Sequence, residues 1–145
     1  MRVASLILCL AAAGAAQTLP DAPAKSTVER VCASCHELGT AVGVRRTKAG
    51  WDSIIDAMIN RGARASEQDF DAIVAYLAKY FGVVNINKAG AAEIQQTLEI
   101  PAEQAEAIVR FRSESGEFKD LPALLKVPGA DAKLLEERKD RIVFR

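Results

Sequence analysis

The sequence predicts an all-α protein made of two small domains. Apolar residues recur at spacings of three and four along most of the chain, as they do on the buried face of a helix. Glycines and capping residues interrupt these stretches, so the helices are short. The composition changes at Phe81-Gly82-Val83, which indicates a domain boundary. The 145 residues suit one ordinary domain or two small ones, and 19 basic against 19 acidic residues give no overall charge that would attract a nucleic acid.

The first 16 residues have the pattern of a secretory signal peptide. Arg2 gives a short basic start, residues 3–13 are apolar, and small residues surround a cleavage site near Ala16. The apolar run is too short to span a bilayer as a helix. We therefore expect a bacterial protein that is periplasmic or secreted after cleavage, with a short linker at residues 17–24. Cleavage would also remove Cys9, which follows Leu8 and so lacks the small residue that precedes a lipoprotein cysteine.

The first predicted helix, residues 27–35, carries a C-x-x-C-H motif formed by Cys32, Cys35 and His36. This is the attachment sequence of c-type haem. The two thiols add to the haem vinyl groups, and the histidine imidazole binds the iron. Cysteines three residues apart lie on one face of a helical turn, which suits this chemistry. The motif therefore predicts one covalently bound haem c, with His36 as a ligand of its iron.

Two other interpretations of the cysteine pair are weaker. A thioredoxin-like dithiol is expected in a βαβ setting, and the surrounding sequence has none. A zinc site needs four nitrogen or sulfur ligands, and without Cys9 the chain offers only Cys32, Cys35 and His36. Export supports the haem interpretation, because c-type haem is attached on the outer side of the bacterial inner membrane.

The rest of the first half predicts two further helices. Residues 38–48 contain two glycines and predict an irregular loop. Residues 50–60 are amphipathic, and a break follows at residues 61–64. Ser66 then caps a last helix with Asp69 as its capping-box partner, and Gly82 ends it. The apolar faces of these two helices carry Trp51, Ile54, Ile55, Met58 and Ile59 in the first, and Phe70, Ile73, Val74, Leu77 and Phe81 in the second.

A helix with C-x-x-C-H, a loop, a middle helix and a final helix with aromatic residues resembles a small class I cytochrome c domain. The resemblance covers residues 25–82. It implies that the first and last helices cross, with Tyr76, Leu77, Tyr80 and Phe81 at the contact, and that a methionine is the sixth iron ligand. A core this small is marginal alone, and a buried macrocycle would supply the missing apolar surface.

Met58 is the candidate for that sixth ligand. It is the only methionine left after signal cleavage, and the chain has no second histidine. A thioether favours ferrous iron and raises the reduction potential. Larger family members place this methionine in a loop, whereas Met58 lies within a helical pattern. The alternatives are a methionine that only fills the core, five-coordinate iron, or ligation by Lys48 or Tyr76.

Arg45, Arg46 and Trp51 are candidates for binding the haem propionates. An arginine fork matches a carboxylate, and an indole N–H donates one hydrogen bond. The alternative is a solvated basic loop. The sequence shows no acid–base pair, nucleophile–base pair or phosphate loop, and its single histidine is assigned to iron. It therefore predicts an electron carrier and not an enzyme.

The second half, residues 83–145, resembles the tandem helix-hairpin-helix domain of the ComEA competence-protein type. The resemblance rests on V-N-I-N at 84–87, G-x-F-x-x-L at 116–121 and V-x-G at 127–129. Helices are expected at 91–98, 102–115, 121–126 and 132–140, with Pro101 at a helix start and N-caps at Asp120 and Asp131. The expected core is Leu98, Ile100, Ala105, Ile108, Val109, Phe118, Leu121, Leu124, Leu125, Leu134, Leu135 and Ile142.

The resemblance implies hairpins whose glycines let the backbone N–H groups approach a DNA phosphate. In this chain Glu99 and Pro101 replace the glycines of the first hairpin. In the second hairpin Gly129 is kept and Asp131 replaces the other. A carboxylate repels phosphate, and proline has no N–H. Residues 83–145 carry 10 basic and 11 acidic residues, although Lys126, Lys133, Arg138 and Lys139 offer a local basic patch.

The sequence therefore predicts a periplasmic mono-haem cytochrome c that transfers electrons between partner proteins. Its helix-hairpin-helix domain is predicted to dock onto a redox partner. One alternative is a haem-containing DNA-binding protein of the ComEA type, which the acidic hairpins disfavour. Another is a haem-based sensor, which an open or labile sixth iron position would favour.

Overall fold

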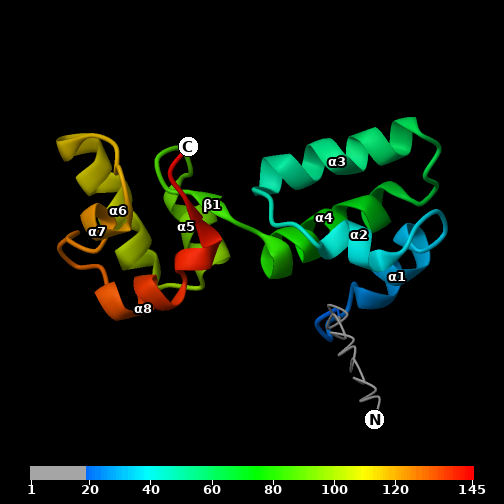
Figure 1. Ribbon diagram of the computed structural model, residues 1–145, viewed down its shortest axis with the longest axis horizontal. Helices are drawn as coiled ribbons and strands as arrows, with labels where there is room; N and C mark the ends of the chain where they lie inside the picture. Colours follow the sequence, from blue (N-terminus) through cyan, green and yellow to red (C-terminus); the bar gives the residue numbers. More distant parts are fainter. Residues whose placement is uncertain (1–18) are drawn as a thin grey trace, which may run out of the picture.

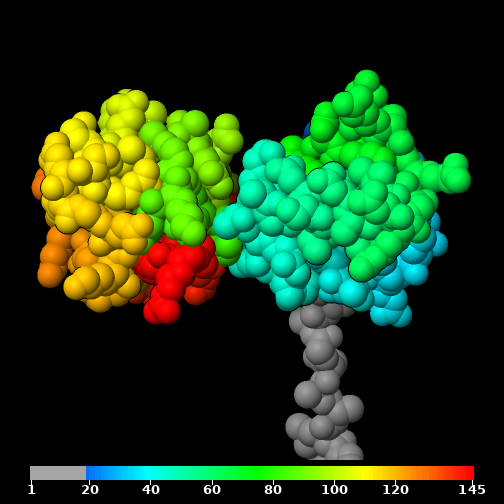
Figure 2. Space-filling view, turned by 90° about the horizontal axis from the view of Figure 1, so that it is seen from above, coloured from blue at the N-terminus to red at the C-terminus, as the bar shows by residue number. Residues whose placement is uncertain are grey.

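The computed structural model describes residues 19–145. The expected signal peptide and the start of the linker lie outside these residues. The described chain is mostly helical, as the sequence predicts, and forms two lobes that meet at a narrow contact (Figures 1 and 2). None of its helices has the length and apolar character needed to cross a membrane.

The first lobe contains four helices: α1 (Lys25–Cys32), α2 (Leu38–Val42), α3 (Lys48–Asn60) and α4 (Glu67–Phe81). α3 and α4 pack side by side, and α1 packs against α4 (Figure 1). Three segments differ from the sequence prediction, and α1 begins at Lys25 where residue 27 was expected. α1 ends at Cys32, the expected loop contains the short helix α2, and α3 begins two residues early because the Thr47 hydroxyl caps it by accepting from the N–H of Gly50.

The core of this lobe joins the first and last helices. Val28 of α1 is fully buried in the same cluster as Tyr76, Leu77 and Phe81 of α4. The start of α4 has the expected capping box, in which Ser66 accepts from the N–H of Asp69 and Asp69 accepts from the N–H of Ser66. Asp69 also accepts a hydrogen bond at 3.0 Å from Arg30 of α1, which lowers the pKa of the Asp69 carboxyl.

The second lobe contains α5 (Ala91–Leu98), α6 (Ala102–Ser115), α7 (Leu121–Leu124), α8 (Ala132–Glu137) and the 3₁₀ helix η1 (Lys139–Arg141). The helix expected at 132–140 is therefore two pieces. A short parallel strand pair that the sequence did not predict joins β1 (Val84–Asn85) to β2 (Ile142–Val143), with Val84 paired to Ile142. The expected apolar residues form one core, in which Val109, Leu121, Leu125 and Leu134 are partly buried and the rest are buried.

The V-N-I-N segment, residues 84–87, holds the two ends of this lobe together through the side chain of Asn87. The side-chain amide nitrogen of Asn87 donates to the carbonyls of Phe118, at 2.8 Å, and Phe144, at 3.0 Å, while its oxygen accepts from the N–H of Phe118. The side chain of Asn85 in turn accepts from the N–H of Asn87. Four partly buried backbone groups are thus satisfied by the side chains of these two asparagines.

The two lobes are joined by backbone and side-chain hydrogen bonds. Arg46 of the first lobe donates from its N–H to the carbonyl of Phe81 and accepts at 2.9 Å from the N–H of Val83. Glycine is required between them at position 82, where a Cβ would lie 1.8 Å from the carbonyl oxygen of Ala78. Arg141 of the second lobe donates to the carbonyl of Lys79 at the end of α4. The lobes therefore share a bonded junction rather than a free linker.

Candidate functional site

The first lobe has an open cavity of about 470 Å³, here called the motif cavity, between α1, α3, α4 and the segment around α2. Its size lies within the ordinary range for sites that bind small molecules and cofactors. Cys32, Cys35 and His36 line it from the end of α1, and Met58 lines it from α3. Most of the remaining wall is apolar and comes from Trp51, Ile54, Ile55, Phe70, Ile73 and Leu77. The fold thus brings the motif and the methionine to one cavity.

The C-x-x-C-H motif lies where α1 ends. Cys32 is the last residue of the helix and is half-buried, whereas Cys35 and His36 follow in an exposed turn. The hydroxyl of Ser34 donates to the carbonyl of Val31 at 2.7 Å and stabilises this turn. Both thiols are free, and burial raises the pKa of the Cys32 thiol, so it is neutral at neutral pH. The two sulfurs are therefore available for covalent attachment.

His36 has one ring nitrogen close to a backbone acceptor. Its Nδ1 lies 3.1 Å from the carbonyl oxygen of Glu37. In the tautomer with the proton on Nδ1, that nitrogen donates to Glu37 and Nε2 carries the free lone pair. Histidines that bind metals commonly donate their other N–H to such a carbonyl, which fixes the tautomer and orients the ring. The local geometry of His36 is therefore suited to a metal ligand.

The three residues predicted to bind propionates lie in different surroundings. Arg46 lines the motif cavity. Trp51 also lines it, but its indole N–H donates to the carbonyl of Phe81 at 3.4 Å and is used within the protein. The guanidinium of Arg45 lies 3.5 Å from the carbonyl of Tyr80, and Arg45 is not part of the cavity wall. Of the three, Arg46 is the one that the fold leaves as a cationic group beside the cavity.

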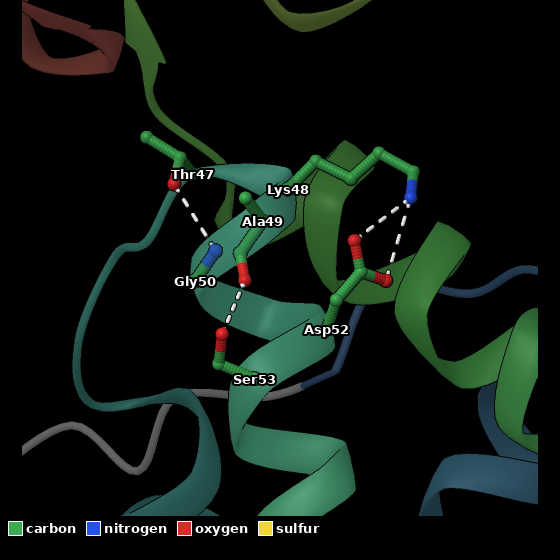
Figure 3. Close-up of polar contacts among 6 residues, drawn as sticks. All are labelled: Thr47, Lys48, Ala49, Gly50, Asp52 and Ser53. Atoms are coloured by element: carbon green, nitrogen blue, oxygen red, sulfur yellow. Dashed lines mark hydrogen bonds and ion pairs between the residues drawn. The ribbon is translucent and has the colours of Figure 1, made fainter.

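The two alternative sixth ligands both lie away from the motif cavity. Lys48 forms an ion pair with Asp52 at 3.0 Å in the first turns of α3, where Thr47 caps the helix and the Ser53 hydroxyl donates to the carbonyl of Ala49 (Figure 3). The Tyr76 hydroxyl donates to the carbonyl of Pro20, and burial raises its pKa. Neither residue belongs to the cavity wall.

Sequence reasoning missed Arg61 and the part of the wall that comes from residues 38–44. Arg61 lines the cavity from the end of α3, three residues after Met58. That spacing places the two residues on neighbouring positions of a helix surface and was the signal that could have found it. Thr40, Ala41 and Val44 line the cavity from the segment that was expected to be only a loop.

The residues present fit a haem. The motif cavity combines two free thiols, an imidazole and a thioether with apolar walls, and Arg46 and Arg61 can pair with two carboxylates. Among the described residues that line it, none is acidic. Within residues 19–145 no group of three or more His, Cys, Asp and Glu side chains converges as a metal site. The donor set of the cavity is instead one imidazole and one thioether, a pair used by c-type cytochromes.

In the second lobe, the first hairpin has Glu99 at a position that favours glycine. Glu99 ends α5 with a φ of 55°, in the left-handed region. Its carboxylate lies 3.9 Å from the guanidinium of Arg141, the residue that also contacts Lys79 across the junction. The neighbouring Pro101 begins α6 without an N–H to donate. Glu99, which stands where a glycine would be expected, thus forms an ion pair with Arg141 at the junction of the lobes.

The second hairpin binds several of its backbone N–H groups to side chains of the same lobe. Gly129 has a φ of 85°, so this glycine keeps the conformation that the turn needs. The carboxylate of Asp131 accepts from the N–H groups of Lys133, at 3.0 Å, and Leu134, at 3.1 Å. The N–H of Asp131 itself donates to the side chain of Gln104 in α6. Three N–H groups at the start of α8, those of Asp131, Lys133 and Leu134, therefore already have side-chain acceptors within the protein.

The local basic patch of the second lobe is partly used by internal contacts. Arg138 donates to the carbonyl of Leu98 at 3.2 Å, and Lys139 pairs with Glu136 at 3.1 Å, which raises the pKa of Lys139. Lys126 and Lys133 are exposed. Two of the four cations thus remain fully available at the surface.

Comparison with known proteins supports the interpretation of the second lobe. Residues 79–143 match the helix-hairpin-helix motif family. An uncharacterized protein of Haemophilus influenzae is 47% identical over 62 residues, which cover 42% of this chain and 55% of that protein. The chain therefore matches about half the length of that relative. No solved structure matches the chain. The second lobe carries a helix-hairpin-helix motif, and the first lobe is interpreted from its own residues.

Proposed function

We propose that the protein is a periplasmic c-type cytochrome that transfers electrons through one haem, with the helix-hairpin-helix lobe as a docking module for a partner protein. One observation carries the proposal. A single cavity of about 470 Å³ is lined both by the C-x-x-C-H motif and by Met58, the one methionine of the described chain, from a different helix. When bound, haem would supply a one-electron iron couple.

Each residue of the motif cavity has a role in this proposal. Cys32 and Cys35 hold the cofactor through thioether bonds. His36, oriented by the Glu37 carbonyl, and Met58 would bind the iron. Arg46 and Arg61 offset the charge of the propionates. The apolar wall would keep water away from the haem. A dry environment and a thioether ligand both favour a high reduction potential of the iron.

The first test is the absorption spectrum of the full chain produced with a c-type haem maturation system. We expect a low-spin spectrum and haem that stays with the protein in acidic organic solvent, and we expect Cys32→Ser/Cys35→Ser to abolish the covalent attachment. Loss of all haem from the unaltered protein on extraction would contradict the proposal.

The sixth ligand is tested by Met58→Ala, which should remove the low-spin His/Met spectrum and allow carbon monoxide to bind. Ile59→Ala, on the next residue of α3 and outside the motif cavity, is the matched control and should leave the spectrum unchanged. An unaltered spectrum in Met58→Ala would contradict this ligand assignment. Rapid carbon monoxide binding by the unaltered protein would favour a haem-based sensor.

The docking role of the second lobe rests on the geometry of its hairpins. Asp131 occupies the N–H groups at the start of α8, Pro101 has none to offer, and Glu99 adds a negative charge. Because phosphate contacts dominate affinity for DNA, these features favour a protein partner over DNA. A titration with duplex DNA at low and moderate salt tests this preference. We expect no binding, and salt-sensitive binding in the micromolar range or tighter would favour the DNA-binding alternative.

A further inference from the structure

A second hollow of the first lobe lies between α3 and α4. This groove, here called the acidic groove, has a volume of about 410 Å³. Its polar residues are all carboxylates, namely Asp52, Asp56, Glu67 and Asp71. Its apolar residues include Ile55, Ile59 and Phe70. It therefore combines an apolar surface with negative charge.

The charges of the two hollows are opposite. Arg46 and Arg61 line the motif cavity, with no acidic residue in its described wall, whereas no lysine or arginine lines the acidic groove. Asp52 is paired with Lys48, but Asp56, Glu67 and Asp71 form no ion pair with any residue from 19 to 145. The acidic groove thus presents unneutralised negative charge that suits a cationic partner.

The two hollows also share a wall. Ile55 and Phe70 line both the motif cavity and the acidic groove, so one layer of side chains separates them. A protein bound in the acidic groove would therefore lie one side chain away from the space assigned to the haem. This proximity is what an electron-transfer contact requires.

The apolar part of the acidic groove is exposed. Ile59 is 40% exposed, and among the described residues only Val44, at the motif cavity, is a more exposed large hydrophobic residue. Grooves between two helices commonly accept the apolar face of an amphipathic helix. A helix of that kind with flanking lysines or arginines would match both the apolar surface and the carboxylates.

We propose that the acidic groove is the docking site of a redox partner that presents a basic amphipathic helix. The apolar face of that helix covers Ile59, and its cations face Asp56, Glu67 and Asp71. The inference rests on the proposed function, since it names the chemistry of the partner that exchanges electrons with this lobe. A symmetric dimer of this chain through the acidic groove is disfavoured, because two copies of the same acidic surface repel each other.

The experiment uses the haem-loaded protein and a fluorescent helical peptide of about 18 residues, which is five helical turns, with leucines on one face and lysines on the other. Fluorescence anisotropy at low and moderate salt measures its affinity. We expect binding that weakens with salt, and no binding of the same peptide with glutamate in place of lysine. Asp56→Asn/Asp71→Asn should weaken binding about fivefold to tenfold at low salt, because two exposed ion pairs are lost.

Two further variants separate the groove from general attraction of cations. Ile59→Ser should weaken binding at both salt concentrations, because it removes apolar contact. Glu106→Gln/Glu114→Gln removes two exposed carboxylates from the second lobe and should leave the affinity unchanged. Equal affinities for the unaltered protein and both groove variants would overturn the proposal, as would a loss of binding in the second-lobe control equal to that in the groove variants.

The same preparation separates this inference from the proposed function. The absorption spectrum reports the haem, and the anisotropy reports the acidic groove. A haem spectrum without peptide binding would overturn the docking inference alone. Peptide binding that depends on the groove, in a protein without covalent haem, would support a basic partner but overturn electron transfer as the reason for it.

Discussion

The two lobes of this protein differ in how their cores are filled. The second lobe has one continuous core, joined at its ends by the parallel strands and by Asn87. The first lobe has a core around Trp51, Val28 and Leu77, but a cavity of about 470 Å³ lies between its helices. A packed core is stabilised by its own residues, whereas a lobe with a large apolar cavity gains further stability from a ligand that fills it. The comparison predicts that the second lobe folds by itself and that the first lobe is completed by the haem proposed above.

The largest expected effect comes from preventing haem attachment with Cys32→Ser/Cys35→Ser. The first lobe should lose protection of its amides against hydrogen exchange, because a ligand that binds only the folded state stabilises it. The amides of α5 and α6 should stay protected. Hydrogen exchange resolved by residue measures both lobes in one experiment. Uniform loss of protection in both lobes, or none in either, would contradict the comparison.

The second lobe should respond most strongly to Asn87→Ala. The substitution removes the partners of the Phe118 N–H and of the Phe118 and Phe144 carbonyls. We expect the free energy of unfolding of this lobe to fall by about 2–4 kcal/mol, since several polar groups lose hydrogen bonds at once. Urea unfolding followed by circular dichroism measures the change. Asn60→Ala, at the exposed end of α3, is the control and should change the free energy by less than about 0.5 kcal/mol.

A smaller effect of opposite sign is expected from Glu99→Gly. Glu99 has a φ of 55°, a conformation that glycine adopts without steric cost. Relief of this strain should raise the free energy of unfolding by about 1 kcal/mol. The ion pair that is lost, to Arg141 at 3.9 Å, involves a half-exposed carboxylate and offsets little of this gain. A marked loss of stability, measured by thermal unfolding, would show instead that the contact with Arg141 governs the junction of the lobes.

The smallest effect concerns pH and the contact between α1 and α4. The hydrogen bond from Arg30 is the main cause that lowers the pKa of Asp69 below its ordinary value of 3.8. A carboxyl whose folded pKa is lowered stabilises the protein above its unfolded pKa, and this stability is lost as the pH falls through the folded pKa. The unaltered protein should therefore lose slightly more stability below about pH 4 than Asp69→Asn does. Thermal unfolding between pH 6 and pH 3, values that bracket the ordinary carboxyl pKa, measures the difference.

Much of the local structure could be predicted from the sequence alone. The helix starts at Ser66 and Asp131 and the core of the second lobe follow from capping residues and apolar spacing. The C-x-x-C-H motif and the acidic replacements in the hairpins were also visible. These features depend on residues that are close together in the chain, and local rules are sufficient to predict them.

The surroundings of the long side chains were decided only by the tertiary structure. The Trp51 N–H donates to Phe81, Arg45 contacts Tyr80, and Arg61 reaches the motif cavity, although the sequence favoured Arg45 and did not single out Arg61. Asp131, predicted as a cap, also has its N–H bound to Gln104. The hydrogen bonds of Trp51, Arg45 and Asp131 each join residues about 30 positions apart in the chain, and no local pattern specifies such a partner.

The candidate site also combines features that the sequence predicts with features that only the tertiary structure decides. The sequence by itself determined which reactive side chains the site contains, because two thiols and an imidazole at fixed spacing are a local motif. The tertiary structure decided that Met58 of α3 lines the same cavity as that motif, and that Ile55 and Phe70 separate this cavity from an acidic groove. The physical reason is that spacing along one helix fixes which residues share its face, whereas the packing of helices against one another decides what that face meets.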